Sequence, residues 1–459
     1  MSADEWIEVL SPFDGSPVAR VPALGAEHVA EAVAAASAAL ARGDFPQYRR
    51  AEVLERAAEL LAERTEEFAV TIAREAGKPI RDARAETLRC VDTLRFSAVE
   101  ARRLSGEVIP MDASASGVGR LGFALRHPVG VIAAISPFNF PLNLVAHKLG
   151  PAIAAGCPVV LKPAELTPVS AIRLVDLLVE AGLPADWISV VTGTGPDAGT
   201  PLVAHPVPAL ITFTGSVAVG RRIQDTAPRK RVLLELGSNA PVIVEPDADL
   251  DRVVAQVRLG GFSYAGQSCI STQRVLAHAD IYDKLLHELK IAVGSLRVGD
   301  PLDEDTEVGP LISEAAAKRV EDWLDRARAA GAEVTGGVRH GTLITPAVVA
   351  DPPRDLDVYR QEVFGPVVTV TPYTHLAEAI GLANDSDFGL QAGVFTADLG
   401  VALRAARELE FGGVLINQVP TFRADQQPYG GLRDAGNTRE GPAYTVQEMT
   451  ELRFVMVSA

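Results

Sequence analysis

The sequence predicts an α/β protein of two domains, each built around a parallel sheet, and three observations support this prediction. The chain has 459 residues, of which 47% are hydrophobic, so it can bury more than one core. From about residue 120 onward, short apolar runs alternate with amphipathic stretches, as is typical of parallel strands covered on both faces by helices. Two such series follow one another, and they meet near Gly237-Ser238-Asn239.

The individual elements follow in order from this pattern. Residues 26–105 predict helices, because Ala, Leu and Val recur at three-to-four spacing through Val29–Leu40 and Ala51–Val70. The first series predicts strands at Val129–Ile135, Pro158–Leu161, Ile188–Val191, Leu210–Thr212 and Val232–Leu234, with helices at Asn143–Ala155, Ser170–Ala181 and Asp197–Ala204. The second series predicts strands at Pro241–Val244, Arg274–Ala277, Val367–Val370, Gly393–Thr396 and Gly413–Ile416.

The chain ends in an apolar run, Glu451–Val457, which predicts a terminal strand. An apolar strand with a free edge promotes aggregation unless something covers that edge. Two solutions stay open from the sequence: pairing with another subunit, or packing against an edge of its own domain.

Charge and composition exclude several classes of partner. The net charge of −16 argues against nucleic acid or an anionic membrane, although local arginines can still attract a small anionic substrate. No apolar run reaches the ~20 residues of a membrane span, and the N-terminus lacks the regions of a signal peptide. Three irregularly spaced cysteines suit a reducing cytoplasm. The eight histidines show no pairing at metal-ligand spacing, so no metal site is expected.

Cys269 is the most informative residue of the chain. It follows the small, polar turn Tyr264–Ser268, whereas Cys90 lies in a charge-rich helical stretch and Cys157 at the start of a buried strand. A thiolate is a strong nucleophile, but with a free pKa of about 8.5 little of it is ionised at neutral pH, so a catalytic site must activate it. Taken alone, this segment favours an inert, packed thiol.

Polar groups stand at the carboxyl ends of the predicted strands, where parallel sheets bind ligands. Asn139 is bracketed by Pro137 and Pro141, and its uncharged amide could receive an oxyanion or simply stabilise a turn. Lys162 and Glu165 end the next strand. They could hold the hydroxyls of a ribose, or form a solvated surface pair.

Further candidate groups lie in the same series. Gly193–Gly199 is a glycine-rich strand-to-helix turn, but it departs from the usual dinucleotide-binding spacing. Thr212–Gly220 opens another helix, whose backbone amides could receive a pyrophosphate unless the segment is a plain loop. Glu235 is flanked by apolar residues, which predicts a raised pKa and a general base rather than an exposed glutamate, and Glu362 is a similar case.

In order and spacing, these motifs together resemble the aldehyde dehydrogenase superfamily over essentially the whole chain. The resemblance rests on Pro-Phe-Asn-Phe-Pro around Asn139, Leu-Glu-Leu-Gly around Glu235, Gly-Gln-Ser-Cys ending at Cys269, and Glu-Val-Phe-Gly-Pro from Glu362. It implies two Rossmann-like domains and a small β oligomerisation element in a homodimer or homotetramer. The implied boundaries are 1–108 with 129–237 for the NAD-binding domain, 238–436 for the catalytic domain, and 109–128 with 437–459 for the oligomerisation element.

The resemblance also implies a role for each group. Cys269 attacks an aldehyde carbonyl, the Asn139 amide and the Cys269 backbone N–H receive the oxyanion, and Glu235 activates water to hydrolyse the thioester. A water-activating glutamate favours a free acid as product over transfer of the acyl group to coenzyme A. Glu165 favours NAD over NADP, because a carboxylate accepts from a ribose 2′-OH but repels a 2′-phosphate. The implied cofactor-binding residues are Ile135, Ser136, Pro137, Phe138, Lys162, Ala164, Glu165, Gly195, Gly199, Phe213, Thr214, Gly215, Ser216, Val219, Leu236, Gly237, Glu362 and Phe364.

The substrate candidates come from the loop Val419–Gly431 and the tail Arg439–Tyr444, which are similar to one branch of the family. That branch includes lactaldehyde, phosphonoacetaldehyde and non-phosphorylating glyceraldehyde-3-phosphate dehydrogenases. Arg423 is expected either to grip a phosphonate, phosphate or carboxylate, or to be a rim arginine paired with Asp425. The other candidate substrate-binding residues are His147, Arg95, Ser268 and Ile270.

We therefore expect the oxidation of a small, polar, anionic aldehyde to its carboxylic acid. The alternatives are an uncharged small aldehyde such as lactaldehyde, a coenzyme A-acylating enzyme, or a catalytically silent fold that serves as a binding protein. Arg433 and Ala435 replace the Lys and Ser that are usual in the family, which bears on the shape of the substrate funnel rather than on the catalytic groups. His147 alternatively caps or packs within its own helix.

Overall fold

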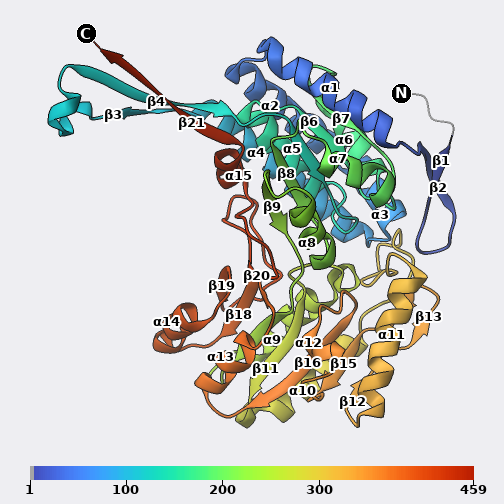
Figure 1. The fold of residues 1–459 in the computed structure, drawn as a ribbon. Coiled ribbons are helices and arrows are strands. Elements are labelled where there is room, and N and C mark those ends of the chain that lie inside the picture. The colour runs from blue at the N-terminus through green and yellow to red at the C-terminus, as the bar shows by residue number, and fades with distance from the viewer. Residues whose placement is uncertain (1–4, 459) are drawn as a thin grey trace.

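In the computed structural model, which describes residues 5–458, the chain forms two lobes and an arm that projects from one of them (Figure 1). A five-stranded sheet lies in the first lobe, a seven-stranded sheet in the second, and a three-stranded sheet forms the arm. The predicted α/β class with two parallel sheets is confirmed.

The first lobe contains four helices that precede its five-stranded parallel sheet in the chain. The helices are α1 (Ala26–Arg42), α2 (Gln47–Glu63), α3 (Thr65–Ala76) and α4 (Ile80–Arg103). In the sheet order β7-β6-β5-β8-β9, the strands are β7 (Ile188–Val190), β6 (Val159–Lys162), β5 (Ile132–Ile135), β8 (Leu210–Thr214) and β9 (Arg231–Glu235). The crossover helices are α5 (Asn143–Ala155), α6 (Val169–Glu180), α7 (Thr200–Ala204) and α8 (Val217–Thr226). A π-helical turn over Gly195–Gly199 precedes α7, so that helix begins later than expected.

The register of this sheet gathers the candidate residues at one edge. Ile135 is the partner of both Lys162 and Phe213, and Thr214 is the partner of Glu235. All strands in the sheet are parallel, so these residues lie at the same carboxyl ends, where a ligand can reach backbone and side chains of neighbouring strands together.

The second lobe contains the seven-stranded sheet. In the sheet order, its strands are β12 (Glu333–Thr335), β15 (Ala347–Ala350), β16 (Val367–Tyr373), β11 (Thr272–His278), β10 (Ala240–Val244), β18 (Gln391–Phe395) and β19 (Gly413–Ile416). Its helices are α9 (Leu250–Phe262), α10 (Ala279–Gly294), α11 (Glu314–Ala329), α12 (Asp357–Arg360), α13 (Leu376–Asn384) and α14 (Leu399–Glu408). The sequence prediction omits β12 and β15 because both runs are short, and β12 is an antiparallel edge strand.

The arm pairs the chain's last strand with an earlier hairpin. It consists of β3 (Glu107–Ile109), β4 (Arg120–Pro128) and β21 (Thr450–Ser458), and α15 (Pro442–Glu448) leads into it. The predicted terminal strand is confirmed, and β21 pairs with β4 of its own chain from Thr450↔Pro128 to Ser458↔Arg120. Its outer edge stays unpaired within residues 5–458.

The remaining strands form small antiparallel pairs. They are β1 (Trp6–Leu10) with β2 (Pro17–Pro22), β13 (Arg339–His340) with β14 (Leu343–Ile344), and β17 (Phe388–Gly389) with β20 (Leu432–Arg433). None of these pairs is predicted from the sequence, and the strands of the last two pairs have only two residues each, too few to show an apolar alternation. No helix of residues 5–458 has the length and apolar character needed to cross a membrane.

The predicted residues meet around a thiol and a long cavity

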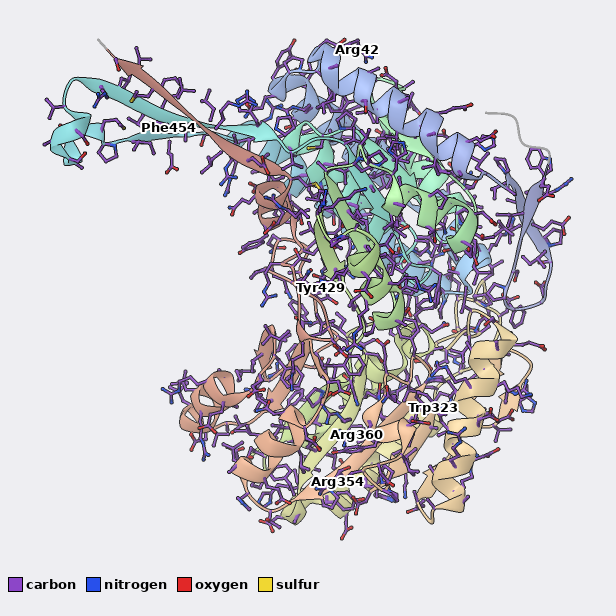
Figure 2. The ribbon with its side chains drawn as sticks, in the orientation of Figure 1. Arg42, Trp323, Arg354, Arg360, Tyr429 and Phe454 are labelled. Atoms are coloured by element: carbon purple, nitrogen blue, oxygen red, sulfur yellow. The ribbon has the colours of Figure 1, made fainter. Side chains whose placement is uncertain are left out.

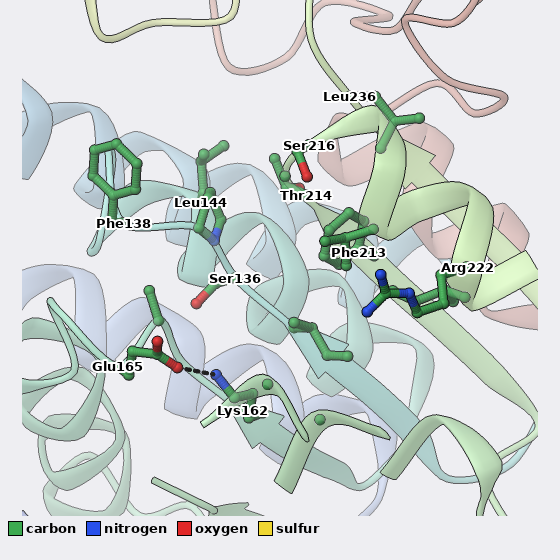
Figure 3. Close-up of a pocket in the computed structure, with 18 of the residues that line it drawn as sticks. Ser136, Phe138, Leu144, Lys162, Glu165, Phe213, Thr214, Ser216, Arg222 and Leu236 are labelled. Atoms are coloured by element: carbon green, nitrogen blue, oxygen red, sulfur yellow. Dashed lines mark ion pairs between the residues drawn. The ribbon is translucent and has the colours of Figure 1, made fainter. Parts of the chain in front are cut away.

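A cavity of about 600 Å³ opens at the carboxyl ends of the first sheet. Every residue expected to bind the cofactor lines it, as do Asn139 and Cys269. Figure 3 shows the Lys162–Glu165 ion pair, 3.9 Å long, on one side and Arg222 on the other. The lining residues that the sequence prediction missed are Leu144, Leu166, Pro196, Thr200, Val203, Arg222, Ile223 and Thr226. Most of them lie on helices, where periodicity shows which residues share a face but does not identify the ligand that the face meets.

The loop before Cys269 has a rare backbone conformation. Tyr264, Ala265 and Gly266 are consecutive residues with positive φ, at 49°, 53° and 70°. A left-handed conformation costs a non-glycine residue about 1–2 kcal/mol, so surrounding contacts must hold the turn. The Tyr264 hydroxyl donates to the Ala76 carbonyl at 2.8 Å, and its backbone N–H donates to the Asp82 carboxylate at 3.1 Å.

Gly266 is required at the end of this turn. A Cβ on Gly266 would lie 2.1 Å from the Gly365 carbonyl oxygen. The turn therefore packs directly against the backbone that follows Phe364, and it presents Cys269 toward the cavity.

Unlike Cys90 and Cys157, Cys269 is not fully buried as a residue. Its Sγ lies 2.8 Å from the hydroxyl oxygen of Tyr429. Burial of the sulfur raises the pKa of the Cys269 thiol to about 12, although the Tyr429 hydroxyl acts to lower it. Cys269 is therefore a thiol at neutral pH, and a nucleophilic role would need a group that stabilises the thiolate.

Asn139 is buried beside the cysteine loop. Its Nδ2 donates to the Gln267 carbonyl at 3.0 Å, which uses one of its two N–H groups. The helix that follows is capped from outside by Glu86, whose Oε1 accepts from the backbone N–H groups of Leu142 and Asn143 at 3.0 and 3.1 Å. Buried Lys78 forms an ion pair with Glu86, so this cap is neutralised.

Glu235 ends β9 with a fully buried carboxyl group. Neither carboxyl oxygen has a hydrogen-bond partner in the described structure. Burial raises the pKa of Glu235 well above its usual range, the Glu440 carboxylate raises it further, and Arg423, Lys148 and Arg439 act in the opposite direction. An unpartnered buried carboxyl group of this kind suits a base that takes a proton from water.

Arg423 is buried, with only 4% of its side chain exposed, and its Nη2 lies 2.8 Å from Oε1 of Glu440. The alternative of a rim arginine paired with Asp425 is therefore wrong. Asp425 instead pairs with Arg89 at 2.8 Å and His147 at 2.9 Å, because these side chains reach it from α4 and α5.

His147 links α5 to the loop that carries Arg423 and Asp425. It is fully buried, and its Nε2 lies 3.2 Å from Nη2 of Arg423. The alternative of a histidine that caps or packs within its own helix is wrong, since its polar partners lie in the distant loop and, for Thr93 at 3.4 Å, on α4.

The other substrate candidates have different surroundings. Ser268 and Ile270 are buried on either side of Cys269. Arg95 has 59% of its side chain exposed and pairs with Asp92 on the same face of α4. Within residues 5–458, the polar contacts of Arg95 do not connect it to the cysteine site, and its substrate role stays a prediction.

Three residues around Cys269 were not singled out from the sequence: Tyr429, Lys148 and Glu440. Lys148 donates to the hydroxyls of Thr212 and Thr214 at 3.1 and 2.7 Å. Glu440 shares a buried ion pair with Arg423. The Tyr-Gly-Gly and Arg-Glu-Gly segments that contain Tyr429 and Glu440 were the available signal, but no spacing rule connects them to Cys269.

The end of the cavity near Cys269 has the chemistry needed for a nicotinamide riboside. Glu362 accepts from the Ser238 N–H at 2.9 Å, and a Cβ on Gly237 would lie 2.6 Å from its Oε2. Phe138 and Phe364 meet edge to face at 5.8 Å. The cavity therefore offers a carboxylate that can bind ribose hydroxyls and an aromatic pair that can pack against a flat ring. Lys162 and Glu165 line the same cavity at the carboxyl end of β6.

Burial raises the pKa of Glu362 to about 7, so its carboxyl group can accept or donate at neutral pH. Within the described residues, no group of three or more His, Cys, Asp or Glu side chains could hold a metal ion.

The comparisons with known proteins agree on one family. Residues 1–455 match the model of the aldehyde dehydrogenase family. A 3-sulfolactaldehyde dehydrogenase from Priestia aryabhattai is 45% identical over 455 residues, which are 99% of this chain and 95% of that protein.

Solved structures agree with this family. Aldehyde dehydrogenase 21 from Physcomitrella patens, in complex with the reaction product succinate, has a TM-score of 0.97 at 41% identity, over 100% of this chain and 96% of that one. Glyceraldehyde-3-phosphate dehydrogenase GapN from Methanocaldococcus jannaschii, complexed with NADP, has a TM-score of 0.95 at 36% identity, over 99% and 100%. The chain therefore belongs to the aldehyde dehydrogenase family and is an NAD(P)-dependent oxidoreductase that acts on aldehydes.

Proposed function

We propose that this enzyme oxidises a small, polar, anionic aldehyde to its carboxylic acid, with Cys269 as nucleophile, Asn139 as oxyanion donor and Glu235 as base. One observation carries the proposal. Cys269 and Asn139 line the same cavity, and Glu235, a buried carboxyl group without a partner, lies close enough to influence the ionisation of the sulfur.

The chemistry follows from these three groups. The Cys269 thiol loses its proton to solvent, its sulfur bonds to the carbonyl carbon, and the π electron pair moves to oxygen, which the Asn139 amide and the Cys269 N–H receive. The oxidised nicotinamide, when bound, supplies the acceptor for the hydride that the former carbonyl carbon then loses. Glu235 takes a proton from water as the water attacks the resulting thioester, and the carbon–sulfur bond breaks to release the acid.

An anionic substrate is supported by the charges around the sulfur. Arg423, Lys148 and Arg439 all act on Glu235, and Arg423 also acts on Cys269. Arg423 is buried and paired, so we propose that it favours an anion mainly through its electric field.

The names of relatives agree with this substrate class. Besides the 3-sulfolactaldehyde dehydrogenase, an aspartate-semialdehyde dehydrogenase 1 from Pseudomonas canavaninivorans is 43% identical over 454 residues. Sulfonate and carboxylate groups are both anionic at neutral pH, and so is the succinate bound to aldehyde dehydrogenase 21.

A second candidate substrate is an uncharged small aldehyde. The ion pair with Glu440 already neutralises Arg423, which favours a neutral substrate. A lactaldehyde dehydrogenase from Methanococcus maripaludis is 37% identical over 460 residues.

We also propose the assembly and surroundings of the enzyme. The three sheets support a division into 1–108 with 129–237 (cofactor), 238–436 (catalysis) and 109–128 with 437–459 (oligomerisation into a homodimer or homotetramer). The free thiols of Cys90, Cys157 and Cys269 suit a reducing cytoplasm.

An aldehyde panel tests the substrate proposal. We expect kcat/KM to be higher for succinic semialdehyde, phosphonoacetaldehyde or glyceraldehyde 3-phosphate than for lactaldehyde, and lowest for hexanal. NADH formation measures each rate. Highest efficiency with lactaldehyde would select the second candidate, and highest efficiency with hexanal would reject both.

Cys269→Ala tests the nucleophile in the same assay. We expect it to lower kcat by roughly 10⁴-fold or more while leaving NAD affinity nearly unchanged. Cys90→Ala, which removes a buried helical thiol, is the matched control and should retain activity. Substantial turnover by Cys269→Ala would reject the proposed mechanism.

A further inference from the structure

The hydroxyl of Tyr429 is the polar partner of the reactive sulfur. Its Oη lies 2.8 Å from Sγ of Cys269, and within residues 5–458 no other side chain forms a hydrogen bond with that sulfur. Tyr429 is 2% exposed and packs in an apolar cluster with Ile270, Leu390 and Ala435, against which Cys269 also packs. Figure 2 places Tyr429 where the two lobes meet.

The phenol is held in place from two directions. The backbone N–H of Tyr429 donates to the Glu440 carbonyl at 2.9 Å, and the Glu440 N–H donates back to the Tyr429 carbonyl. The guanidinium carbon of Arg423 lies 3.8 Å from the centroid of the Tyr429 ring, and Arg423 is anchored to the Glu440 carboxylate at 2.8 Å. Backbone pairing and ring stacking therefore fix the direction of the hydroxyl.

Gly430, the residue after Tyr429, lies next to Glu235, the proposed base. A Cβ on Gly430 would lie 3.0 Å from Oε1 of Glu235, so that carboxyl group lies against the backbone that carries Tyr429. The nucleophile, the phenol and the base thus adjoin one short segment, 429–430.

The chemistry of sulfur shows what the phenol can do there. When the Cys269 thiol loses its proton to a base, Tyr429 keeps its own proton and its O–H donates to the thiolate. Once the sulfur has bonded to the carbonyl carbon, it is a much weaker acceptor. The interaction is therefore strongest for the thiolate, both before attack and when the carbon–sulfur bond breaks in thioester hydrolysis.

We propose that Tyr429 is a further catalytic residue, whose hydroxyl donates to the thiolate form of Cys269, and that Arg423 is a positioning residue that holds the phenol. This inference rests on the proposed role of Cys269 as nucleophile. The other ionisable groups that act on the sulfur are Glu362 and Glu235, which disfavour the thiolate, and Arg423, which favours it.

Tyr429→Phe tests the proposal, because it keeps the ring on Arg423 and removes only the hydroxyl. The rate of alkylation of Cys269 by iodoacetamide, measured against pH in the full-length enzyme without aldehyde, reports the fraction of thiolate. A hydrogen bond to a charged group is worth about one to two units of thiol pKa, and the pKa of Cys269 is already raised, so we expect the alkylation rate at a given pH to fall about ten- to hundredfold. Cys269→Ala gives the background rate of the two buried cysteines.

Tyr373→Phe is the matched control. It removes another buried phenol hydroxyl, which donates to the Val244 carbonyl at 3.0 Å in the second lobe, and it should leave the alkylation profile unchanged. An alkylation profile of Tyr429→Phe identical to that of the unmodified enzyme would overturn the proposal.

A second variant covers the case in which Tyr429→Phe does not fold. Fluorotyrosine at position 429 preserves the shape and makes the phenol a stronger donor, so the alkylation rate at a given pH should rise; an unchanged or lowered rate contradicts the proposal. The outcome for Cys269→Ala keeps the two proposals separate. An inactive Cys269→Ala with an unshifted Tyr429→Phe profile rejects only the role of Tyr429, whereas an active Cys269→Ala rejects the nucleophile.

Discussion

Burial decides the protonation of the individual groups in this active site. Cys269, Glu235 and Glu362 all have raised pKa values, in each case chiefly because the charged form loses its hydration. Glu440 differs: burial alone would raise its pKa, but Arg423, His147 and Lys148 lower it to about 2. The pKa values of these two neighbouring glutamates therefore differ widely. Glu440 stays charged, whereas Glu235 can exchange a proton.

This contrast predicts how kcat depends on pH. Only ionised Glu235 can take a proton from water, and because its pKa is raised, kcat should fall as the pH falls through that raised pKa. Glu235→Gln should slow steady-state turnover by about 10²–10⁴-fold, remove this acid limb and leave a rapid first turnover. Stopped-flow detection of NADH separates the burst from the slow phase.

Glu245→Gln is the control, since Glu245 also follows a buried strand but lies in the second lobe. It should retain both the acid limb and normal turnover. A Glu235→Gln enzyme without a burst, or with an unchanged acid limb, contradicts the role of Glu235 in thioester hydrolysis.

The carboxyl ends of the parallel strands bring the predicted cofactor-binding residues together. The parallel register places Ile135, Lys162 and Phe213 side by side, and the segments beyond them complete the cavity. Glu165 follows β6 and pairs with Lys162 at 3.9 Å, and 47% of its side chain is exposed at the cavity edge. A carboxylate in this position would accept from a ribose hydroxyl and repel a ribose phosphate.

Glu165→Ser should therefore relax the preference for NAD. Removal of the carboxylate leaves Lys162 and Arg222 to attract a 2′-phosphate, so the ratio of kcat/KM for NADP to that for NAD should rise roughly ten- to hundredfold. Initial rates with each cofactor at one aldehyde concentration measure this ratio. Glu180→Ser, a surface substitution on α6, serves as control, and an unchanged ratio in Glu165→Ser refutes the role of this residue.

At the scale of the whole molecule, the arm carries apolar side chains to solvent. Leu452, Phe454 and Met456 lie on one face of β21 and are 52%, 52% and 47% exposed, and Figure 2 shows Phe454 near the middle of the arm. The opposite face exposes Leu121 and Leu125 of β4. An exposed apolar surface with a free strand edge is typical of an interface between subunits.

The double substitution Leu452→Asp and Phe454→Asp should therefore dissociate the proposed oligomer. Charges on this face oppose its burial against a second copy, so the mass measured by light scattering should fall toward that of the monomer, 48.5 kDa. Glu451→Lys on the same strand changes an exposed charge and should keep the mass of the unmodified enzyme. An unaltered mass in the double variant places the interface elsewhere.

The sequence by itself determined the five strands of the first sheet and five of the seven strands of the second, because apolar runs are local properties. The strand-end motifs, through their resemblance to a family, also gave the cofactor-binding residues, but the sequence missed β12, β15 and eight residues that line the cavity. It did not determine the partners of Arg423 or the contact between Tyr429 and Cys269. These contacts depend on which distant segments pack together in the buried site. Cys269 and Tyr429, for example, are separated by 160 residues. Only the tertiary structure decides such contacts, since burial and neighbouring charges set each group's partner and protonation, and neither is encoded in a residue's immediate sequence.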